Sequence, residues 1–517
     1  MKKIFFFIGS YFILIQLHAQ PNIDKKRDFV WLTGYENVDF GQRTYYGTTI
    51  TDFGSCELTQ YSKQTNIDFT ASSASICDTS GKLMFYTNGN TIEDSTGQIM
   101  QNGDSLSFPD YQYPTGSYVP QGSLILPLGD GYNYVILHPP GVEYDAAYTP
   151  AKPFFRTVLL TRIDMRGNNG KGAIISKNIP ILYDTCRGPY ARACRHANGR
   201  DWWVLRLNKN LSKCYRLLIS PYGIDSLPPL TLPFVADTAA FSAGVNVSFS
   251  PDGRQFAQHS GTKLWLYDFD RCAGVLSNRR IFYRNRDFFS GIAFSPNSRY
   301  LYISRDTTVT QYDTYAIDIN ASKIIVARWD STYTTIDNWQ AANKFFQPVL
   351  APNGKIYINC PGTHIVWHVI NNPDAAGLAC DVQQHAIRLP TWYYATTPNL
   401  PNFRLGAERG TVCDSLGIEE SAPYICVQNT TTSNPEKQEV KVRLYPNPAA
   451  NELTLDYADW QHKKVIITDL VGRTEKILSL QSESNKFDIS TLQNGVHYVS
   501  IYDENRLVYC GKLVVLR

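Results

Sequence analysis

The stretch from Arg195 to Trp203, RHANGRDWW, holds the densest group of chemically active side chains in the sequence. A histidine, two arginines and an aspartate stand beside two tryptophans, a set that could bind polar ligand groups against aromatic rings. The structural interpretation is favoured: Asn198-Gly199 fits a hairpin turn that places the tryptophans in the packing of a sheet. The alternative hypothesis is a face that binds a sugar or a peptide, with the candidate residues Arg195, His196, Arg200 and Trp202.

Other polar clusters give no motif for a metal or a cofactor. His364 and His368 are four residues apart in a strand-like stretch, where that spacing spans ~13 Å, so one ion cannot bind both. No CxxC pair and no DxDxDG loop is present, so neither zinc nor calcium is predicted. A P-loop and a GxGxxG turn after a strand are also missing. The sequence therefore predicts no metal and no cofactor.

Linear motifs of catalysis are missing as well. We find no GxSxG elbow and no HExxH motif. Asp268 and Asp270 share one face of YDFD, but the sequence supplies no opposing partner for acid–base work. These observations favour a protein that is not an enzyme.

The elements that must position these residues form a degenerate repeat between residues 27 and 406. A clear copy is IAFSPNSRYLYIS from Ile292: an apolar run, a turn with Pro and Asn, and a second alternating run. That pattern is typical of a β-hairpin, because Gly and Asn tolerate the left-handed turn conformation. The turn positions lie 45 to 68 residues apart and are Gly81, Gly131, Gly199, Gly253, Ser298 and Gly354.

This period predicts the fold class. Units of about 40–55 residues with three or four strands each are typical of propeller blades. Long stretches with helical spacing are missing from the sequence. We predict an all-β chain whose residues 27–406 form a β-propeller, with seven blades favoured and six possible. A β-sandwich with chance repetition is the alternative.

The first residues carry an export signal. Lys2 and Lys3 precede an apolar stretch from Ile4 to about Leu17, and Ala19 offers a small residue before a cut. The stretch is shorter than the ~20 residues that a membrane span needs. We predict a cleaved signal peptide at residues 1–19 and no transmembrane helix in the mature chain.

The cysteine content and the net charge indicate which bonds and which partners to expect. The mature chain holds 11 cysteines, an odd number, so at least one thiol should stay free. Export permits disulfides, and the candidate pairs are Cys56–Cys77, Cys186–Cys194 and Cys413–Cys426. A formal net charge of +3 without a run of five basic residues argues against nucleic-acid binding.

The composition changes after the repeat. Residues 407–440 are polar and rich in Thr and Asn, which is typical of a linker. Residues 441–517 then show the alternating runs ELTLDY, KVIITDL, HYVSIY and KLVVL. Several short strands in so small a unit predict a small β-sandwich.

Four stretches of this terminal unit carry a resemblance: LYPNPAANELTL from Leu444, VIITDLVGR from Val465, DISTLQNG from Asp488 and KLVVLR from Lys512. In their order and spacing they resemble the type A C-terminal sorting domain of the Bacteroidetes type IX secretion system. The resemblance implies the sorting-motif residues Tyr445, Pro446, Asn447, Pro448, Asp469, Gly472, Arg473, Gly495 and Lys512. It also implies that an outer-membrane translocon reads the unit, which is then removed. His497 stands where the family usually has Tyr, and we expect slightly weaker packing there.

The repeat region resembles exported Bacteroidetes proteins with WD40-like or YVTN-like propellers. The resemblance rests on GKLMFYTNGNTI, CRHANGRDWWVL, YDFDRCAG, GIAFSPNSRYLYIS and GKIYINCPGTHIVWHVINNPDAAGLAC. It implies a fold and a location but no reaction.

The sequence thus predicts a secreted protein, at the outer cell surface or released. Its partners would be the type IX translocon, through the C-terminal domain, and an unknown protein or glycan, bound without catalysis. The alternative is a secreted propeller enzyme, a glycan lyase or hydrolase. That alternative would require several carboxylates, Arg and His from different blades to converge on one pocket.

Overall fold

The computed structural model of the chain describes residues 22–39, 41, 45–55, 58–106, 116–117, 120–141, 143–145, 152–187, 192–208, 212–233, 247–259, 263–283, 290–336, 339–419, 421–422, 424, 442–457, 460–461, 463–469, 474–503 and 506–517. The predicted signal peptide and residues 425–440 of the predicted linker lie outside these ranges. The chain divides into two compact units, Met1–Val427 and Gln428–Arg517. Within the described ranges, no helix is long and apolar enough to cross a membrane.

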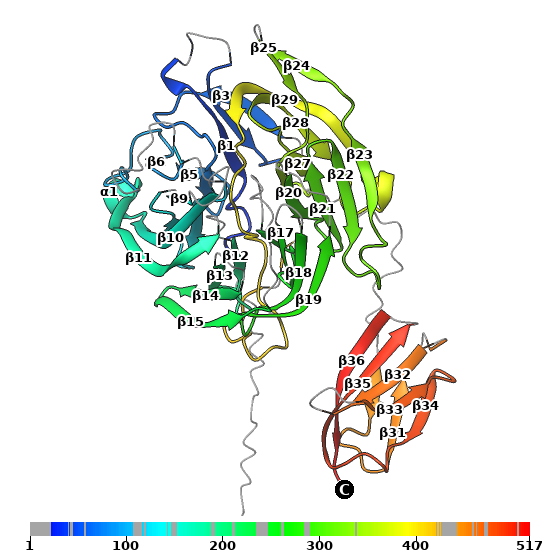
Figure 1. Cartoon of the computed structure of the whole chain (residues 1–517). Helices are drawn as coiled ribbons and strands as arrows, with labels where there is room; N and C mark the ends of the chain where they lie inside the picture. Colours follow the sequence, from blue (N-terminus) through cyan, green and yellow to red (C-terminus); the bar gives the residue numbers. More distant parts are fainter. Residues whose placement is uncertain are drawn as a thin grey trace, which may run out of the picture. The chain divides into compact units, whose positions relative to one another are not determined.

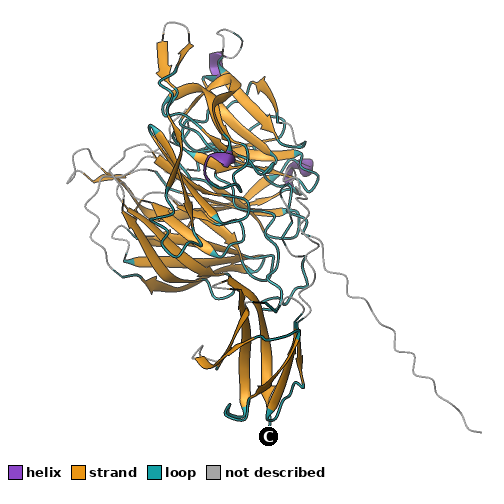
Figure 2. Ribbon diagram, turned by 90° about the vertical axis from the view of Figure 1, so that its right-hand side faces the viewer, coloured by secondary structure: helices purple, strands orange, loops and turns teal. Residues whose placement is uncertain are grey.

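Strands dominate both units, as Figure 2 shows. Helical structure in the described ranges is confined to three short segments: η1 (Asn37–Asp39), α1 (Gly167–Gly170) and η3 (Gly377–Cys380). The predicted all-β class is therefore confirmed.

The N-terminal unit is a succession of antiparallel sheets, numbered here 1 to 7 in chain order (Figure 1). Sheets 1 and 2 contain β1 (Val30–Tyr35), β2 (Gly47–Asp52) and β3 (Thr59–Lys63), then β4 (Ala74–Cys77), β5 (Leu83–Thr87) and β6 (Ile92–Asp94). Sheet 3 contains β7 (Leu124–Pro127), β8 (Asn133–His138), β10 (Lys152–Asp164) and β11 (Ala173–Arg187), with β9 (Glu143–Asp145) paired to β10.

The later sheets have four strands each in sequential order. Sheets 4 and 5 contain β12 (Arg192–Arg195), β13 (Trp202–Leu207), β14 (Lys213–Ser220) and β15 (Gly223–Thr231), then β16 (Val247–Phe249), β17 (Gln255–His259), β18 (Lys263–Asp270) and β19 (Val275–Tyr283). Sheets 6 and 7 contain β20 (Ser290–Phe294), β21 (Tyr300–Arg305), β22 (Thr308–Asp313) and β23 (Ile324–Arg328), then β26 (Pro348–Leu350), β27 (Ile356–Ile358), β28 (Thr363–Ile370) and β29 (Val382–Tyr394). Between them, β24 (Tyr333–Ile336) and β25 (Trp339–Ala342) form a hairpin.

Neighbouring sheets pack face to face, so both faces of many strands are buried. In β13, Trp202 and Trp203 point to opposite faces because side chains alternate along a strand. Trp202 packs in a cluster shared with sheets 2 and 3, whereas Trp203 packs in a cluster shared with sheet 5. This double burial explains why these strands have nearly continuous apolar runs.

Apolar clusters join the sheets in chain order, from sheet 1 through sheet 7. A further cluster joins sheet 7 to sheet 1. There the ring of Trp31 in β1 lies 6.3 Å from the rings of both Tyr357 and Trp367. The unit therefore has a β-propeller-like fold.

The six turn positions predicted from the sequence are confirmed. All have positive φ, between 65° and 95°: Gly81, Gly131, Gly199, Gly253, Ser298 and Gly354. Each lies between the first and second strands of its sheet, in sheets 2 to 7. The turn between the first two strands needs a residue with positive φ, and Gly or Ser of the repeat stands at that position.

Aspartate carboxylates stabilise the first turns of sheets 2 and 3. Asp78 accepts hydrogen bonds from the amides of Ser80 and Lys82, at 2.8 and 3.0 Å. Partial burial raises the pKa of the Asp78 carboxyl, but hydrogen bonds from Ser80 and Lys82 outweigh burial and hold the pKa below its usual value. The amide of Asn133 and its side chain lower the pKa of Asp130 in the same way, against the opposing effect of burial.

We expect these turn carboxylates to make stability depend on pH in the acid range. A folded pKa below the unfolded value, about 3.9 for Asp, gives stability that is fully present above the unfolded pKa. That stability is lost as the pH falls through the folded pKa. Urea midpoints of the wild type and Asp78→Asn should therefore differ at neutral pH and converge in acid. A difference that stays constant across this range would contradict the ionised carboxylate as its source.

An irregular segment, residues 396–424, passes along the first strands of the sheets; we call it the exit segment. Near its start, the side-chain amide of Asn399 donates to the carbonyl of Ser123, just before β7, at 2.9 Å. Further on, the amide of Glu408 donates to the carbonyl of Ala197, just after β12, at 2.8 Å. In Figure 1 this yellow segment runs along the middle of the unit. It therefore occupies space between the first strands.

The exit segment is also covalently tied to the body. Cys413 is bonded to Cys272 in the turn between β18 and β19, with the Cα atoms 5.7 Å apart. The predicted pairs Cys56–Cys77, Cys186–Cys194 and Cys413–Cys426 are therefore wrong: Cys77 and Cys194 are free and buried. Both thiols lie in apolar clusters between sheets, where they pack as small hydrophobic groups. The prediction of at least one free thiol is confirmed.

The C-terminal unit has two antiparallel sheets around one apolar core. The first consists of β30 (Arg443–Tyr445), β31 (Glu452–Asp456) and β34 (Ser484–Asp488). The second has the order β33 (Thr474–Ser479), β32 (Lys463–Thr468), β35 (Gly495–Asp503) and β36 (Arg506–Val515). Alternate residues of these strands, such as Val465 and Ile467 of β32, point into the core.

Candidate functional site

The candidate loop forms the first turn of sheet 4, and three of its four candidate side chains are buried. Arg195 is 1% exposed, and its Nη2 donates to the carboxylate of Asp24 at 3.0 Å. Its guanidinium also lies 3.7 Å from the ring centre of Trp202, which is fully buried. His196, also buried, accepts a hydrogen bond from the amide of Asn198 through Nδ1. These three side chains hold the turn against its neighbours.

Arg200 is the one candidate among the four that presents part of its side chain to solvent. Its guanidinium donates to both carboxylate oxygens of Asp201, at 2.7 and 3.2 Å. The same group lies 5.2 Å from the ring centre of Tyr222, in the turn between β14 and β15. Tyr222 is 88% exposed. A cation and an open aromatic face thus stand side by side at this edge of sheet 4.

A hollow of about 440 Å³ lies beside Arg200. Besides Arg200 its lining includes Asn22, Ile23, Gly129, Gly199, Leu416 and Ile418. The first turn of sheet 3 contributes Gly129 to the lining. The same turn contains Tyr132, which is 53% exposed and whose ring centre lies 5.7 Å from the guanidinium of Arg166. The turns of sheets 3 and 4 approach closely here, because a Cβ on Gly129 would lie only 2.8 Å from Cγ of Arg200. We call this area, with its two tyrosine–arginine pairs, the turn-face hollow.

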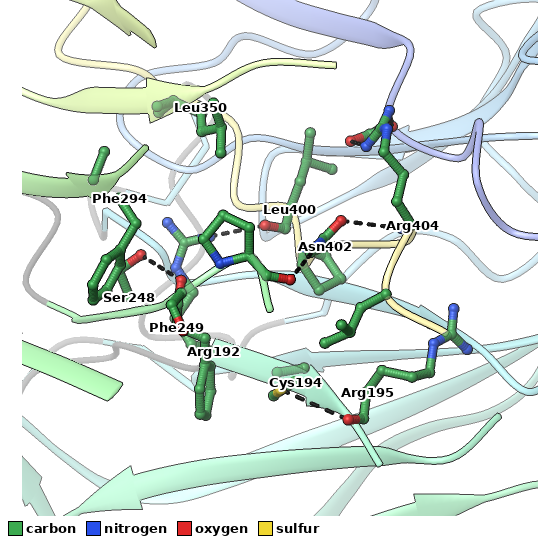
Figure 3. Close-up of a pocket in the computed structure, with 18 of the residues that line it drawn as sticks. Arg192, Cys194, Arg195, Ser248, Phe249, Phe294, Leu350, Leu400, Asn402 and Arg404 are labelled. Atoms are coloured by element: carbon green, nitrogen blue, oxygen red, sulfur yellow. Dashed lines mark hydrogen bonds and ion pairs between the residues drawn. The ribbon is translucent and has the colours of Figure 1, made fainter. Parts of the chain in front are cut away.

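Charged side chains also gather where the exit segment passes the first strands (Figure 3). Arg404 of the exit segment donates to both carboxylate oxygens of Asp28, each at 2.7 Å, and both side chains are buried. Asp24 is paired with Arg27 and with Arg195, at 3.0 Å in each case. Both carboxylates are therefore engaged by arginines, which leaves neither as a free acid or base.

A cavity of about 90 Å³ lies between the exit segment and the first strands of sheets 4 to 7. Its walls include Phe249, Phe294 and Leu350, which Figure 3 shows around the opening. Arg192 of β12 also lines it, and burial lowers the pKa of this guanidinium to about 10. At ~30 Å³ for each water, the cavity has room for about three water molecules, which is too little for a sugar ring.

The other polar clusters seen in the sequence are engaged within the fold. His364 and His368 on β28 are fully buried, and burial lowers their pKa values to about 4 and about 3, so both are neutral at physiological pH. Asp268 is ion-paired with Arg280. Asp270 accepts hydrogen bonds from the amides of the following turn. Among the described residues, no group of three or more His, Cys, Asp or Glu side chains could hold a metal ion.

In the C-terminal unit, the motif Tyr445-Pro446-Asn447-Pro448 is held against β36 by Asn447. Its Nδ2 donates to the carbonyl of Lys512 at 2.8 Å, and its Oδ1 accepts from the amide of Val514 at 2.8 Å. The side-chain amide thus pairs with β36 as the backbone of a neighbouring strand would. The hydroxyl of Tyr445 donates to the carboxylate of Asp456 at 2.9 Å.

The remaining sorting-motif residues lie at strand ends. Gly495 opens β35 with φ of 147°, where a side chain would be strained. Asp469 directly follows β32, whereas Gly472 and Arg473 lie outside the described residues. The side chain of Lys512 is exposed.

His497 is 4% exposed, with its ring nitrogens bonded to the carboxylate of Glu475 and the carbonyl of Gln493. Both ring nitrogens of His497 thus have hydrogen-bond partners, at the position where the sorting-domain family usually has Tyr. Weaker packing there stays a prediction.

Arg517 was not singled out from the sequence, although it ties three parts of the C-terminal unit together. Its Nη1 and Nη2 donate to the carbonyls of Leu492 and Ile489, at 2.8 Å each. Its Nε donates to Oδ1 of Asn451 at 2.8 Å. Only its position at the end of the KLVVLR stretch could have pointed to this role from the sequence.

Comparison with known protein families identifies this unit. The family described as "Secretion system C-terminal sorting domain" matches residues 443–516. The C-terminal unit is therefore a sorting domain, as the resemblance implied, and it points to type IX export to the cell surface or the extracellular space. No curated protein matches the sequence.

Solved structures similar to the chain are distant from it. A putative 6-phosphogluconolactonase from Bacteroides fragilis is 12% identical, with a TM-score of 0.38, and the match covers 72% of this chain and 97% of that one. The periplasmic gluconolactonase PpgL of Pseudomonas aeruginosa is 10% identical, with a TM-score of 0.36 and coverages of 71% and 99%. PorZ, a surface component of the type IX secretion system of Porphyromonas gingivalis, is 12% identical, with a TM-score of 0.27 and coverages of 91% and 68%.

Proposed function

We propose that this chain is a binding protein of the outer cell surface or the extracellular space, with a seven-bladed β-propeller as its working part. In this proposal, the signal peptide of residues 1–19 takes the chain across the inner membrane. The sorting domain, within residues 441–517, takes it across the outer membrane and is then removed. Residues 407–440 join the propeller of residues 27–406 to the sorting domain, and the first part of this stretch packs against the sheets within the exit segment. The propeller binds a glycan or a protein without transforming it.

The blade count is supported by packing. Seven sheets follow one another along the N-terminal unit, and an apolar cluster around Trp31 joins the seventh to the first. A sandwich would bury two sheets against each other and would not give each sheet two covered faces. The seven sheets are the blades of the proposal.

Binding is favoured over catalysis because the carboxylates beside the hollow and the cavity are paired with arginines. Asp28 is paired with Arg404, Asp24 with Arg27 and Arg195, and Asp201 with Arg200. Glycoside hydrolysis needs two carboxyl groups about 5–10 Å apart that are free to donate a proton or attack. Each of these three carboxylates already accepts hydrogen bonds from a guanidinium, so none is free to attack a sugar.

The turn-face hollow is the ligand site of this proposal, and the predicted loop contributes to it through Arg200. Tyr222 and Tyr132 offer broad apolar faces, and Arg200 and Arg166 offer planar sets of N–H donors beside them. Sugar rings have apolar faces and hydroxyl edges, so this surface favours a glycan. The turn itself is stabilised by the buried side chains of Arg195, His196 and Trp202, which do not reach the ligand in this proposal.

Replacing Tyr222 by alanine should weaken glycan binding about tenfold, a loss of about 1.4 kcal/mol. A glycan array on the secreted N-terminal unit identifies the ligand, and calorimetry then measures its affinity. Tyr183→Ala is the matched control, because Tyr183 on β11 is 74% exposed and belongs to neither tyrosine–arginine pair of the turn-face hollow. Equal losses in both variants would contradict the site, and cleavage products of the bound glycan would favour the enzyme alternative.

Deleting residues 441–517 should stop the protein from reaching the cell exterior, because these residues contain the sorting domain. Cell fractionation with an antibody against the N-terminal unit measures this. The truncated protein should accumulate inside the outer membrane as a folded, protease-resistant body. Its appearance outside at the full-length level would contradict the sorting function.

A further inference from the structure

Arg192 is a partly buried cation for which the described residues supply no carboxylate. Its Nε donates to the carbonyl of Val247 at 3.3 Å, and its Nη1 donates to the carbonyl of Leu400 at 2.9 Å. No ion pair joins it to a described Asp or Glu, and loss of hydration is what lowers its pKa. By contrast, the nearby guanidinium groups of Arg195 and Arg404 each have an aspartate. Counted over the part of the chain that the structure describes, an excess positive charge thus remains beside the 90 Å³ cavity.

The guanidinium also retains donors for a ligand. An arginine has five N–H donors, and two of those in Arg192 are used on backbone carbonyls. The remaining three belong to Nη1 and Nη2, whose outer hydrogens form the fork that matches a carboxylate. A partly buried cation has lost part of its hydration, so occupancy by an anion would stabilise this region.

The other walls limit what the anion can be. Phe249, Phe294 and Leu350 make much of the cavity apolar, which suits a ligand with a short hydrocarbon part. The volume is that of about three water molecules, so a ligand with two or three carbon atoms fits and a sugar acid does not. One unbalanced cation favours a single negative charge over the double charge of phosphate.

We propose that this cavity is a binding site for a small monocarboxylate anion, of the size of acetate or propionate, held by Arg192 through a two-pronged hydrogen bond. The site lies between the exit segment and the first strands of sheets 4 to 7. A bound anion would therefore link the exit segment to the sheets. The inference is independent of the ligand proposed for the turn-face hollow.

The test uses the full chain without its signal peptide. Sodium propionate, acetate, chloride and phosphate are compared at equal ionic strength by thermal melting and calorimetry. Propionate and acetate should raise Tm saturably, and chloride and phosphate should not. Arg192→Met should weaken propionate binding at least tenfold, whereas Arg299→Met, which removes an exposed arginine paired with Asp313, should leave it unchanged.

A second measurement keeps the test decisive if Arg192→Met fails to fold. Carbon-13-labelled acetate, titrated with wild-type protein and followed by NMR, should show saturable binding that unlabelled propionate displaces. Absence of saturable binding, equal binding of chloride or phosphate, or undiminished binding to a folded Arg192→Met variant would overturn the proposal. Glycan binding at the turn-face hollow should be the same with and without propionate, so failure of one proposal leaves the other standing.

Discussion

Replacing Cys272 by serine is expected to lower the free energy of unfolding of the N-terminal unit by about 5 kcal/mol, because it opens a very long loop. The Cys272–Cys413 bond joins residues 141 positions apart, with sheets 6 and 7 and most of the exit segment between them. In the chain-entropy account, closing such a loop restricts the unfolded chain and leaves the folded one little changed. Urea unfolding with and without a reducing agent measures the loss.

The control variants remove the other cysteine of the bond, or both cysteines. Cys413→Ser and the double variant should lose as much stability as Cys272→Ser, since removing either sulfur removes the same bond. The reducing agent should destabilise the wild type and leave all three variants unaffected. If reduction leaves the wild-type midpoint unchanged, the bond does not stabilise the unit.

The same bond shows where sequence reasoning fails. All three predicted pairs joined cysteines that are neighbours along the chain, whereas Cys413 finds its partner across the fold. Cys77 and Cys194 sit on first strands, with their thiols between sheets, and only the packing reveals that. Pairing depends on distances between Cα atoms, and nothing in cysteine spacing encodes them.

Local chemistry, by contrast, could be predicted. The turn positions from Gly81 to Gly354 were predicted correctly because a left-handed turn residue is selected by its immediate neighbours. The sorting domain could be identified for a related reason: its motif residues act at strand ends and turns. Asn447, which pairs with β36, is one of them.

The candidate site could be predicted in part. The interpretation of residues 195–203 as a hairpin turn with tryptophans in the packing of a sheet is confirmed, because Trp202 and Trp203 are buried in two clusters. The ion pair that holds Arg195 could not be predicted, because its partner Asp24 is far away along the chain. The exposed partner Tyr222 lies in a different turn, and the sequence offered no reason to pair it with Arg200.

Replacing Arg404 by methionine is expected to cost about 3–5 kcal/mol of stability, because it leaves Asp28 as an unpaired buried charge. The two residues are 376 positions apart, and both side chains are at most 8% exposed. Methionine keeps much of the apolar length of arginine, so loss of packing contributes little. Urea unfolding at neutral pH measures the change.

The matched comparison is Arg166→Met, which breaks the ion pair with Asp164, where the arginine side chain is 62% exposed. That change should cost far less stability than Arg404→Met, since water solvates the arginine there. Combining Arg404→Met with Asp28→Asn should cost less than the sum of the single changes, because no charge is then left unpaired. Additive losses would mean that the two side chains act separately. A shortfall would show that Asp28 and Arg404 are coupled, so that this pair of charges helps to hold the leading residues against the exit segment.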